Sequence, residues 1–485
     1  MLFTRFFLFC AASFFFSFHL FANTLSHPVS MDSWFSEFKR NASPSELYQF
    51  VHSLPKGGDL HHHLSGSGYG QWWYDIASSA EKNGGYTYYT RVSDNGCTAF
   101  GDNAFDFETP HFLFHTIAQP TWQGLTQCQQ KEYVALAKLD HNQRLGFINS
   151  IQLDKPHEGR DEFFERHWQR LNELTANPVL MAKILLLNMQ AYQKEHLYYL
   201  ETQVNIRNKM YPDGSLYTPE DALAVFTDML NSAEAKATGV TVRFQYALVR
   251  FTPNTDEQLK WIYAFVDQHR DWYVGINLVG REDDPKGHPT RFKKVLRQLR
   301  AQYPKINLAF HAGESESPNE NIKDTLLLGV DRIGHGINLL SDDDTYLLMR
   351  NNRYLIETNL ISNLKLEYIE RFSEHPFPQY LRTGVPTALS TDDKGMWNSS
   401  LTDEYYVAVT QFNLSWTELR QLSENSLAYS FLQPNDKAQH LQKLSDALDI
   451  FERNSVMQRG TKTKPRYSPF ICQFEPVLCT ERNSQ

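Results

Sequence analysis

The chain has 485 residues, with 47 Lys and Arg against 56 Asp and Glu, which gives a formal net charge of −9. This length exceeds that of one compact domain of typical size, unless the fold is a large barrel with insertions. An apolar content of 41% excludes general disorder. The acidic balance argues against nucleic acid or an anionic membrane as the main partner, so a small-molecule ligand fits better.

The first 22 residues differ from the rest of the chain. Residues 1–22 contain one charged side chain, Arg5, followed by an apolar run rich in Phe. A short basic start before an apolar core is typical of a secretory signal peptide, and Ala22 is a suitable residue before the cleavage site. A retained membrane anchor is the alternative, although the run is short for spanning a bilayer. We expect a secreted or periplasmic protein that begins near Asn23, with no stable membrane association after cleavage.

Export would place the cysteines in an oxidising compartment. Removal of residues 1–22 leaves Cys97, Cys128, Cys472 and Cys479, an even number. Proximity in the sequence favours the disulfides Cys97–Cys128 and Cys472–Cys479 over the crossed pairings. Free thiols are the alternative.

Short apolar runs rich in β-branched residues alternate with amphipathic stretches along the chain. Strands that alternate with helices indicate parallel pairing, and eight such strands predict a (β/α)8 TIM barrel, with chemistry at the C-terminal ends of the strands. A doubly wound sheet has the same rhythm and is the alternative. The strand-like runs are 57–63, 196–205, 241–249, 273–279, 306–311, 331–335, 354–358 and 386–391, and helix-like stretches include 219–235, 255–268 and 289–302.

The remaining segments extend this barrel. Residues 23–54 form an N-terminal segment, and the barrel domain is expected over 55–455, closed by helices within 401–455. Residues 65–131 are rich in Gly, Asn, Thr and aromatic side chains and contain the first cysteine pair, so they are interpreted as an inserted subdomain. The tail 456–485 is expected to be loosely packed and tied by its own cysteine pair.

The first predicted strand ends in three consecutive histidines. Side chains alternate along a strand, so His61 and His63 face the same way and His62 faces the other. Two imidazoles two residues apart can bind one metal ion. The alternative is a polar strand end with solvated histidines.

Three further strand ends carry residues of the same chemistry. The motif with His311 and Glu314 ends the fifth strand, His335 ends the sixth, and Asp392 and Asp393 end the eighth. In a barrel the C-terminal strand ends meet at one face. The convergence of imidazoles and acids on that face predicts a metal site.

These motifs, in this order, resemble the adenosine/AMP deaminase family of metal-dependent hydrolases. The resemblance runs from about residue 55 to 432 and includes the stretch GINLVGRE at 275–282. The insert at 65–131 resembles that of the secreted adenosine deaminase growth factor branch, in which an insert at this place is linked to receptor binding.

The resemblance implies one zinc ion per chain. Carried over position by position, its ligands are His61, His63, His311 and Asp392. Three neutral imidazoles and a carboxylate suit Zn²⁺, with a water completing the site. His335 would orient this water and help to deprotonate it, and Asp392 would also accept a hydrogen bond from the attacking hydroxyl.

The resemblance also implies which residues bind the purine. Glu314 would donate a proton to purine N1, Asp393 would hydrogen-bond N7, and the backbone N–H of Gly280 would meet N3. Ser65 stands where the family often has an Asp that contacts the ribose. A serine can still hydrogen-bond a sugar hydroxyl.

The resemblance predicts an exported zinc-dependent adenosine deaminase that converts adenosine, and 2′-deoxyadenosine, to inosine and ammonia. Adenine or a modified adenosine are alternative substrates, whereas AMP is disfavoured because no Lys/Arg cluster adjoins the motifs. A binuclear amidohydrolase would need a bridging Lys on the fourth strand, which offers Asn277 instead. The cytidine-deaminase type needs a Cys-x-x-Cys pair, and the chain has none.

A receptor-binding or signalling protein on the same barrel is the alternative from another class, with the insert 65–131 as its recognition surface. A protein that only binds a receptor could lose a metal ligand or the acid Glu314 without losing its function. This chain keeps all of these residues. The sequence leaves open whether the protein is a monomer or a homodimer.

Overall fold

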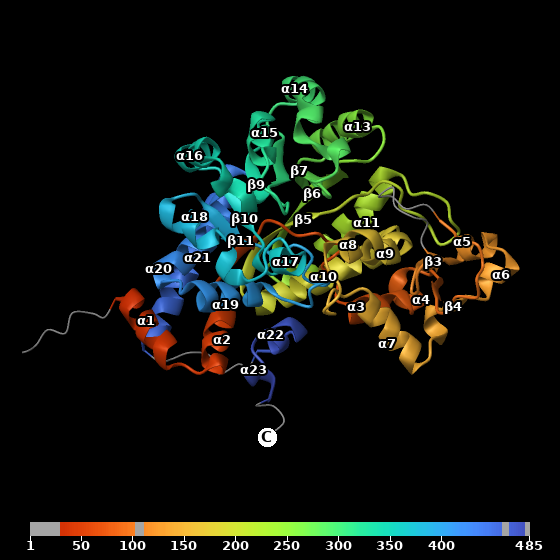
Figure 1. Ribbon diagram of the computed structural model, residues 1–485, viewed down its shortest axis with the longest axis horizontal. Helices are drawn as coiled ribbons and strands as arrows, with labels where there is room; N and C mark the ends of the chain where they lie inside the picture. Colours follow the sequence, from red (N-terminus) through yellow and green to blue (C-terminus); the bar gives the residue numbers. More distant parts are fainter. Residues whose placement is uncertain (1–29, 102–110, 458–464, 481–485) are drawn as a thin grey trace, which may run out of the picture.

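The computed structural model describes residues 30–101, 111–457 and 465–480 (Figure 1). The predicted signal peptide, residues 1–22, lies outside the described residues. Within the described ranges, no helix is long and apolar enough to cross a membrane.

Eight parallel strands form the centre of the molecule and confirm the predicted TIM barrel. Each strand pairs with the next in the order β1-β5-β6-β7-β8-β9-β10-β11. Most strand residues are buried, which suits strands covered by helices on the outside and packed side chains inside. Their bounds are β1 Gly57–Asp59, β5 Leu197–Gln203, β6 Thr241–Val249, β7 Tyr273–Val279, β8 Asn307–Ala312, β9 Arg332–His335, β10 Leu355–Thr358 and β11 Thr387–Leu389.

The barrel closes between its first and last strands. His62 and Asp392 form a parallel bridge. The backbone N–H of Asp392 donates to the carbonyl of His61 over 2.9 Å, and that of His63 donates to the carbonyl of Asp392 over 3.2 Å. A doubly wound sheet would leave these edges apart. Closure therefore brings the first and last sequence motifs together.

Helices surround the barrel, and one of the three helices expected from the sequence is interrupted. The stretch 219–235 divides into α11 and α12 because Ser232 is extended and its side chain caps the second helix by accepting from the N–H of Ala235. The surrounding helices are α10 Pro178–Lys194, α11 Pro219–Asn231, α12 Ala233–Ala237, α13 Thr255–Gln268, α14 Lys293–Gln302, α15 Asn321–Leu327, α16 Asp343–Asn352, α17 Leu360–Lys365, α18 Phe377–Thr383, α19 Leu401–Phe412, α20 Trp416–Ala428 and α21 Pro434–Val456.

The insert between β1 and α10 projects from one side of the barrel (Figure 1). Its centre is an antiparallel sheet in the order β3-β2-β4. The predicted end of the insert at Lys131 is too early, because β4 at Tyr133–Ala135 still pairs with β2. Three residues carry too little alternation to reveal β4, whereas the equally short barrel strands β1 and β11 lie within longer strand-like runs. The elements of this region are α3 Gly70–Ala77, α4 Ala80–Asn83, β2 Tyr88–Arg91, β3 Thr116–Ala118, α5 Gln119–Gly124, α6 Gln127–Gln130, β4 Tyr133–Ala135, α7 His141–Ser150, α8 Arg160–Glu162 and α9 Trp168–Thr175.

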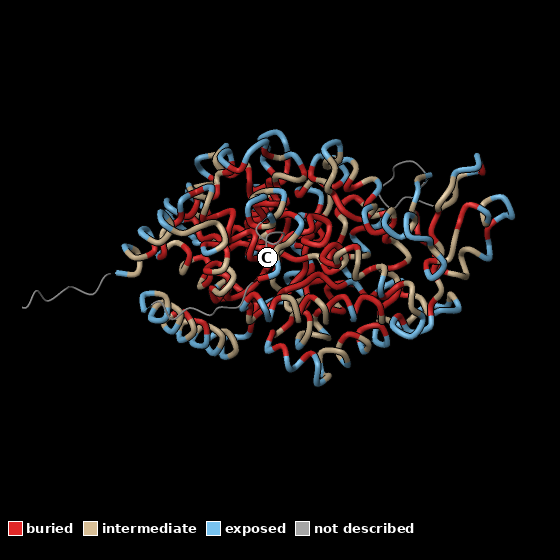
Figure 2. The backbone as a smooth tube through the Cα atoms, turned by 90° about the horizontal axis from the view of Figure 1, so that it is seen from below, coloured by how far each residue is buried: buried red, intermediate tan, exposed pale blue. Residues whose placement is uncertain are grey.

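The two ends of the described chain pack on the same side of the barrel (Figure 1). Helix α1 (Met31–Asn41) contacts α20, and helix α2 (Pro44–Ser53) contacts α19. The tail was expected to be loosely packed, but Phe470 and Ile471 of α22 (Pro469–Phe474) are buried. The disulfide Cys472–Cys479 joins α22 to α23 (Val477–Thr480). Figure 2 shows the buried chain concentrated in the middle of an elongated body.

The disulfide Cys97–Cys128 links residues 31 positions apart within the insert. In the chain-entropy model, closing such a loop stabilises the folded state by about 3–4 kcal/mol. We expect the Cys97→Ser/Cys128→Ser variant to be cleaved faster by protease within the insert, as mapped by mass spectrometry. The Cys472→Ser/Cys479→Ser variant is the matched control and should leave cleavage of the insert unchanged. Faster cleavage throughout the barrel would contradict this assignment of the disulfide to the insert alone.

Candidate active site

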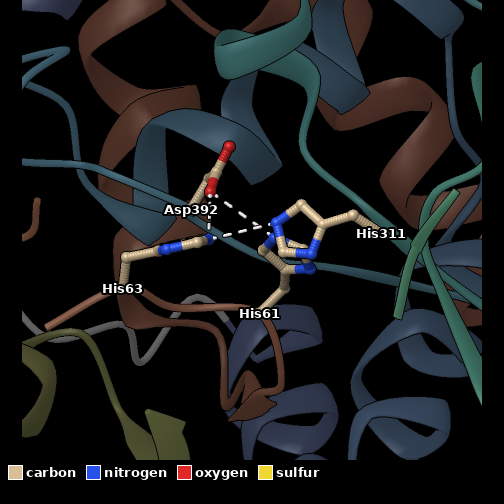
Figure 3. Close-up of side chains that lie close together, drawn as sticks. All are labelled: His61, His63, His311 and Asp392. Carbon is tan, nitrogen blue, oxygen red and sulfur yellow. Dashed lines mark hydrogen bonds and ion pairs between the residues drawn. The ribbon is translucent and has the colours of Figure 1, made fainter. Parts of the chain in front are cut away.

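The predicted ligands converge at the C-terminal face of the barrel. The ligand atoms of His61, His63, His311 and Asp392 all lie within 4.8 Å of one another. His63 Nε2 is 3.1 Å from Asp392 Oδ1 and 3.2 Å from His311 Nε2, and His61 Nε2 is 3.5 Å from Asp392 Oδ1. The four side chains point toward one another (Figure 3).

The donor set fits a zinc ion. His61 Nδ1 lies 2.8 Å from Glu357 Oε2, and His311 Nδ1 lies 2.9 Å from Asn277 Oδ1. An oxygen acceptor at Nδ1 holds the proton there and turns the lone pair of Nε2 toward a metal. His61 Nε2 is buried and makes no hydrogen bond within the described part of the chain. Three imidazoles and one carboxylate are zinc-type ligands.

Electrostatics also favour a cation at this position. Burial disfavours a charged imidazole, yet the adjacent carboxylates of Asp392 and Glu357 raise the pKa of His61 to about 10. Burial alone would raise the pKa of Asp392, but the adjacent imidazoles of His61 and His63 outweigh it and hold this pKa well below its ordinary value. The carboxylates thus attract positive charge, which a proton or a metal ion can supply.

The acid Glu314 is held by the loop that follows β8. Glu282 accepts the backbone N–H of Gly313 over 2.9 Å and that of Glu314 over 3.0 Å. Burial, followed by the nearby charges of Asp392 and Glu282, raises the pKa of Glu314 well above its ordinary value. A carboxyl group kept neutral in this way can donate a proton at neutral pH.

His335 lies between the acid and the ligand cluster. Its Nε2 is 3.6 Å from Glu314 Oε2 and 4.0 Å from Asp392 Oδ2. Asn363 Nδ2 lies 3.0 Å from His335 Nδ1, so the amide donates to Nδ1 and the ring proton sits on Nε2. Burial lowers the pKa of His335 well below its ordinary value. The neutral ring can orient a water molecule beside the cluster.

A cavity of about 320 Å³ opens in front of these groups. Its size is that of a small-molecule site. Its polar lining includes Ser65, Gly280 and Asp393, in addition to the acid Glu314 and three of the four cluster residues, His63, His311 and Asp392. The apolar part of its wall consists mainly of Phe163, Phe164, Trp168, Met181, Phe226 and Leu366.

Two glycines shape the polar side of this cavity. Gly280 has a φ of +94°, a conformation that other residues adopt only with strain. A Cβ atom on Gly66 would lie 1.6 Å from Asp393 Oδ1, so only glycine leaves room for that carboxylate. Asp393 Oδ1 is buried and makes no hydrogen bond within the described residues, and burial raises the pKa of Asp393 well above its ordinary value. Asp393 can therefore bind a ligand in protonated form.

Several supporting residues were not found from the sequence. Glu357 accepts a hydrogen bond from Arg332 Nε over 2.6 Å, in addition to its contact with His61. Ser362 Oγ donates to Asp392 Oδ2 over 2.6 Å. Both lie in or just after β10, the strand for which the sequence assigned no role. Their position at the end of a barrel strand could have marked both residues as candidates for the site. Their hydrogen-bond partners lie on other strands, so these pairings could be identified only from the folded chain.

The sequence profile described as adenosine deaminase matches residues 148–447, more than half of the chain. The chain belongs to the adenosine deaminase family. The predicted enzyme class, a hydrolytic purine deaminase, agrees with this membership.

Two proteins named adenosine deaminase are moderately similar to this chain in sequence. The adenosine deaminase of Enterococcus faecalis is 29% identical over 246 residues, covering 50% of this chain and 70% of that protein. The adenosine deaminase of Aedes albopictus is 28% identical over 275 residues, covering 54% of this chain. The chain thus spans about half the length (50%) of the mosquito protein.

Solved structures show the same fold. A Burkholderia ambifaria amidohydrolase with bound Zn has a TM-score of 0.61 at 16% identity, covering 90% of this chain and 97% of that one. The N6-methyl-AMP deaminase of Arabidopsis thaliana has a TM-score of 0.60 at 19% identity, covering 83% and 99%. The adenine deaminase of Arthrobacter aurescens has a TM-score of 0.58 at 16% identity, covering 81% and 99%.

Glu357→Gln keeps the shape of the side chain but removes the negative charge beside His61. Loss of an outer partner of a metal-binding histidine commonly weakens metal affinity 10–100-fold, and we expect that loss in a chelator competition assay with zinc. Asp403→Asn is the matched control, because Asp403 is equally buried but contacts Tyr48 and Ser468 rather than a metal-binding histidine. Unchanged zinc affinity in Glu357→Gln would contradict the role given to this carboxylate.

Proposed function

We propose that the protein is a zinc-dependent adenosine deaminase that hydrolyses adenosine and 2′-deoxyadenosine to inosine or 2′-deoxyinosine and ammonia. The observation that carries the proposal is one cavity lined by His63, His311, Asp392 and the buried acid Glu314. The relatives named adenosine deaminase in Enterococcus faecalis and Aedes albopictus support the substrate, and the zinc-containing Burkholderia ambifaria structure supports the metal.

Each residue of the site has its own role in the proposed reaction. A zinc ion held by the cluster would supply Lewis-acid activation of a water molecule. Glu314, neutral in its buried loop, donates its proton to purine N1 and makes C6 electrophilic. His335 and Asp392 hold the attacking water beside C6. One proton of this water passes to the amino group, which leaves as ammonia, and the other returns to Glu314. Gly280 and Asp393 bind N3 and N7 and set the orientation of the ring, and Ser65 faces the sugar.

Adenine and N6-modified adenosines are the nearest alternative substrates. The Arthrobacter aurescens adenine deaminase and the Arabidopsis thaliana N6-methyl-AMP deaminase share the fold. The completeness of the site argues against receptor binding as the sole function.

The direct test is turnover by the purified protein, followed as loss of absorbance when the amino group leaves. Adenosine and 2′-deoxyadenosine should be deaminated with a higher kcat/KM than adenine or N6-methyladenosine. Metal analysis after dialysis should find one zinc ion per chain, since the described residues offer one four-ligand cluster with a carboxylate and three histidines. Two tightly bound ions, or none, would contradict the proposed site.

Glu314→Gln should retain zinc but lose most turnover of adenosine. The amide has the same shape yet cannot transfer a proton to N1, and a general acid contributes roughly 10²–10⁴-fold to the rate. Glu320→Gln, an exposed change in the same loop region, is the control and should keep full kcat. A Glu314→Gln enzyme with near-normal kcat would show that this acid is only structural.

Export is a separate part of the proposal. Residues 1–22 would direct the chain out of the cytoplasm, as their signal-peptide pattern predicts. After expression in a bacterium, cell fractionation should recover the protein outside the cytoplasm, with an N-terminus near Asn23 by sequencing. A variant without residues 2–22 should stay inside the cell. An uncleaved full-length protein in the membrane fraction would support the anchor alternative instead.

A further inference from the structure

A buried lysine directly follows the two acids at the end of β11. Lys394 is fully buried, and its Nζ makes no hydrogen bond within the described part of the chain. Asp392 and Asp393 line the substrate cavity, whereas Lys394 is not among the residues of its wall. The lysine therefore acts from behind the wall and not by contact with the ligand.

Three aromatic rings lie around the Lys394 ammonium group and form an aromatic cage. The distance from Nζ to the ring centre is 4.6 Å for Tyr192, 5.0 Å for Tyr69 and 5.7 Å for Trp72. A cation at such distances is attracted by the negative face of a ring, most strongly where water is excluded. Tyr69 and Trp72 belong to the start of the insert, and Tyr192 to α10. The lysine thus joins the loop after β11 to the insert and to α10.

The backbone beside Lys394 packs closely against the loop after β1. The N–H of Gly395 donates to the carbonyl of Gly66 over 3.0 Å, and the N–H of Ser399 donates to the carbonyl of Lys394 over 3.0 Å. A Cβ atom on Gly395 would lie 2.2 Å from the carbonyl oxygen of Gly68. Because the two loops leave no room between them, a shift of Lys394 would pass to its neighbours in the chain.

The neighbour that faces the ligand is Asp393. Its Oδ1 is buried and makes no hydrogen bond within the described residues, so it is free to bind a ligand. The carbonyl of Asp393 accepts from the N–H of Met396 over 2.8 Å, within the same loop. Because no hydrogen bond in the described chain holds Oδ1, its position follows that of the backbone.

We propose that Lys394 is a positioning residue, whose ammonium group in the aromatic cage holds the backbone of Asp393 so that this acid meets purine N7. This inference rests on the proposed deaminase function and concerns its purine recognition. The metal ligand Asp392 is held separately, because its backbone pairs with His61 and His63. Loss of the ammonium group should therefore weaken purine binding without releasing the metal.

The kinetic test uses Lys394→Met, which removes the charge and keeps an unbranched side chain of similar length. The N7 contact exists both in the bound substrate and in the transition state, so its loss should raise KM and leave kcat nearly unchanged. In the zinc-loaded enzyme we expect KM for adenosine to rise roughly tenfold, within the strength of one desolvated cation–π contact. A fall in kcat with unchanged KM, or a loss of zinc, would contradict the proposal.

A binding measurement separates positioning from a merely structural role. Inosine and 7-deazainosine differ at N7, where the deaza ring carries a C–H group that accepts no hydrogen bond. In calorimetry, which requires no turnover, the unmodified protein should bind inosine at least about tenfold more tightly, and Lys394→Met should reduce this preference to less than about threefold. Equal weakening of both ligands would mean that Lys394 only stabilises the fold, and would overturn the proposal.

Two further variants serve as controls. Lys56→Met removes another fully buried lysine, which precedes β1 and donates from Nζ to the carbonyls of Val51 and Glu195; it should lower the unfolding temperature and keep the preference for inosine. Trp72→Leu leaves Lys394 in place and removes one ring of the cage, so the preference should fall severalfold, and the double variant should be no worse than Lys394→Met alone. If Lys394→Met fails to fold, Trp72→Leu decides the question, and an unchanged preference in it overturns the proposal.

The outcomes keep this inference distinct from the proposed function. Deamination of adenosine together with a normal preference for inosine in Lys394→Met would overturn the positioning role and leave the deaminase intact. A preference for inosine that Lys394→Met abolishes, in a protein that does not deaminate adenosine, would support the positioning role and contradict the proposed function.

Discussion

The closure of the barrel between β1 and β11 is the constraint on which the rest of the site depends. The backbone of Asp392 pairs with both His61 and His63, residues more than three hundred positions earlier in the chain. These hydrogen bonds complete the sheet and also place two imidazoles beside a carboxylate. Asp392 has a φ of +55°, a left-handed conformation that Asp tolerates better than most residues. The same pairing thus forms the fold and assembles the metal ligands.

A chain of buried charges supports this arrangement from inside the barrel. Arg332 donates to Glu201 over 2.5 Å and to Glu357 over 2.6 Å, and Glu357 reaches His61 over 2.8 Å. Buried charges are costly unless each is paired. The members of this chain come from different strands and pair with one another inside the barrel. Burial would raise the pKa of Glu357, but Arg332 and His61 hold it below its ordinary value.

The cavity combines a charged end with an apolar wall. The acids and histidines gather at the strand ends, whereas Phe163, Phe164 and Trp168 come from the long connection between β1 and β5. An apolar wall excludes water and raises the strength of nearby electrostatic interactions. The same burial raises the pKa of the Glu314 carboxyl well above its ordinary value. The connection that builds the insert therefore also contributes to the environment of the reaction.

The barrel and its polar strand ends could be predicted from the sequence, because alternating apolar strands and helices and motifs such as His61-His62-His63 are local patterns. The helix break at Ser232 and the short strand β4 could not, since a side-chain cap and a three-residue pairing leave little periodicity. The partners Glu357, Asn277 and Ser362 also needed the folded chain. Distances between residues far apart in the chain are set by barrel closure, and no local pattern contains them.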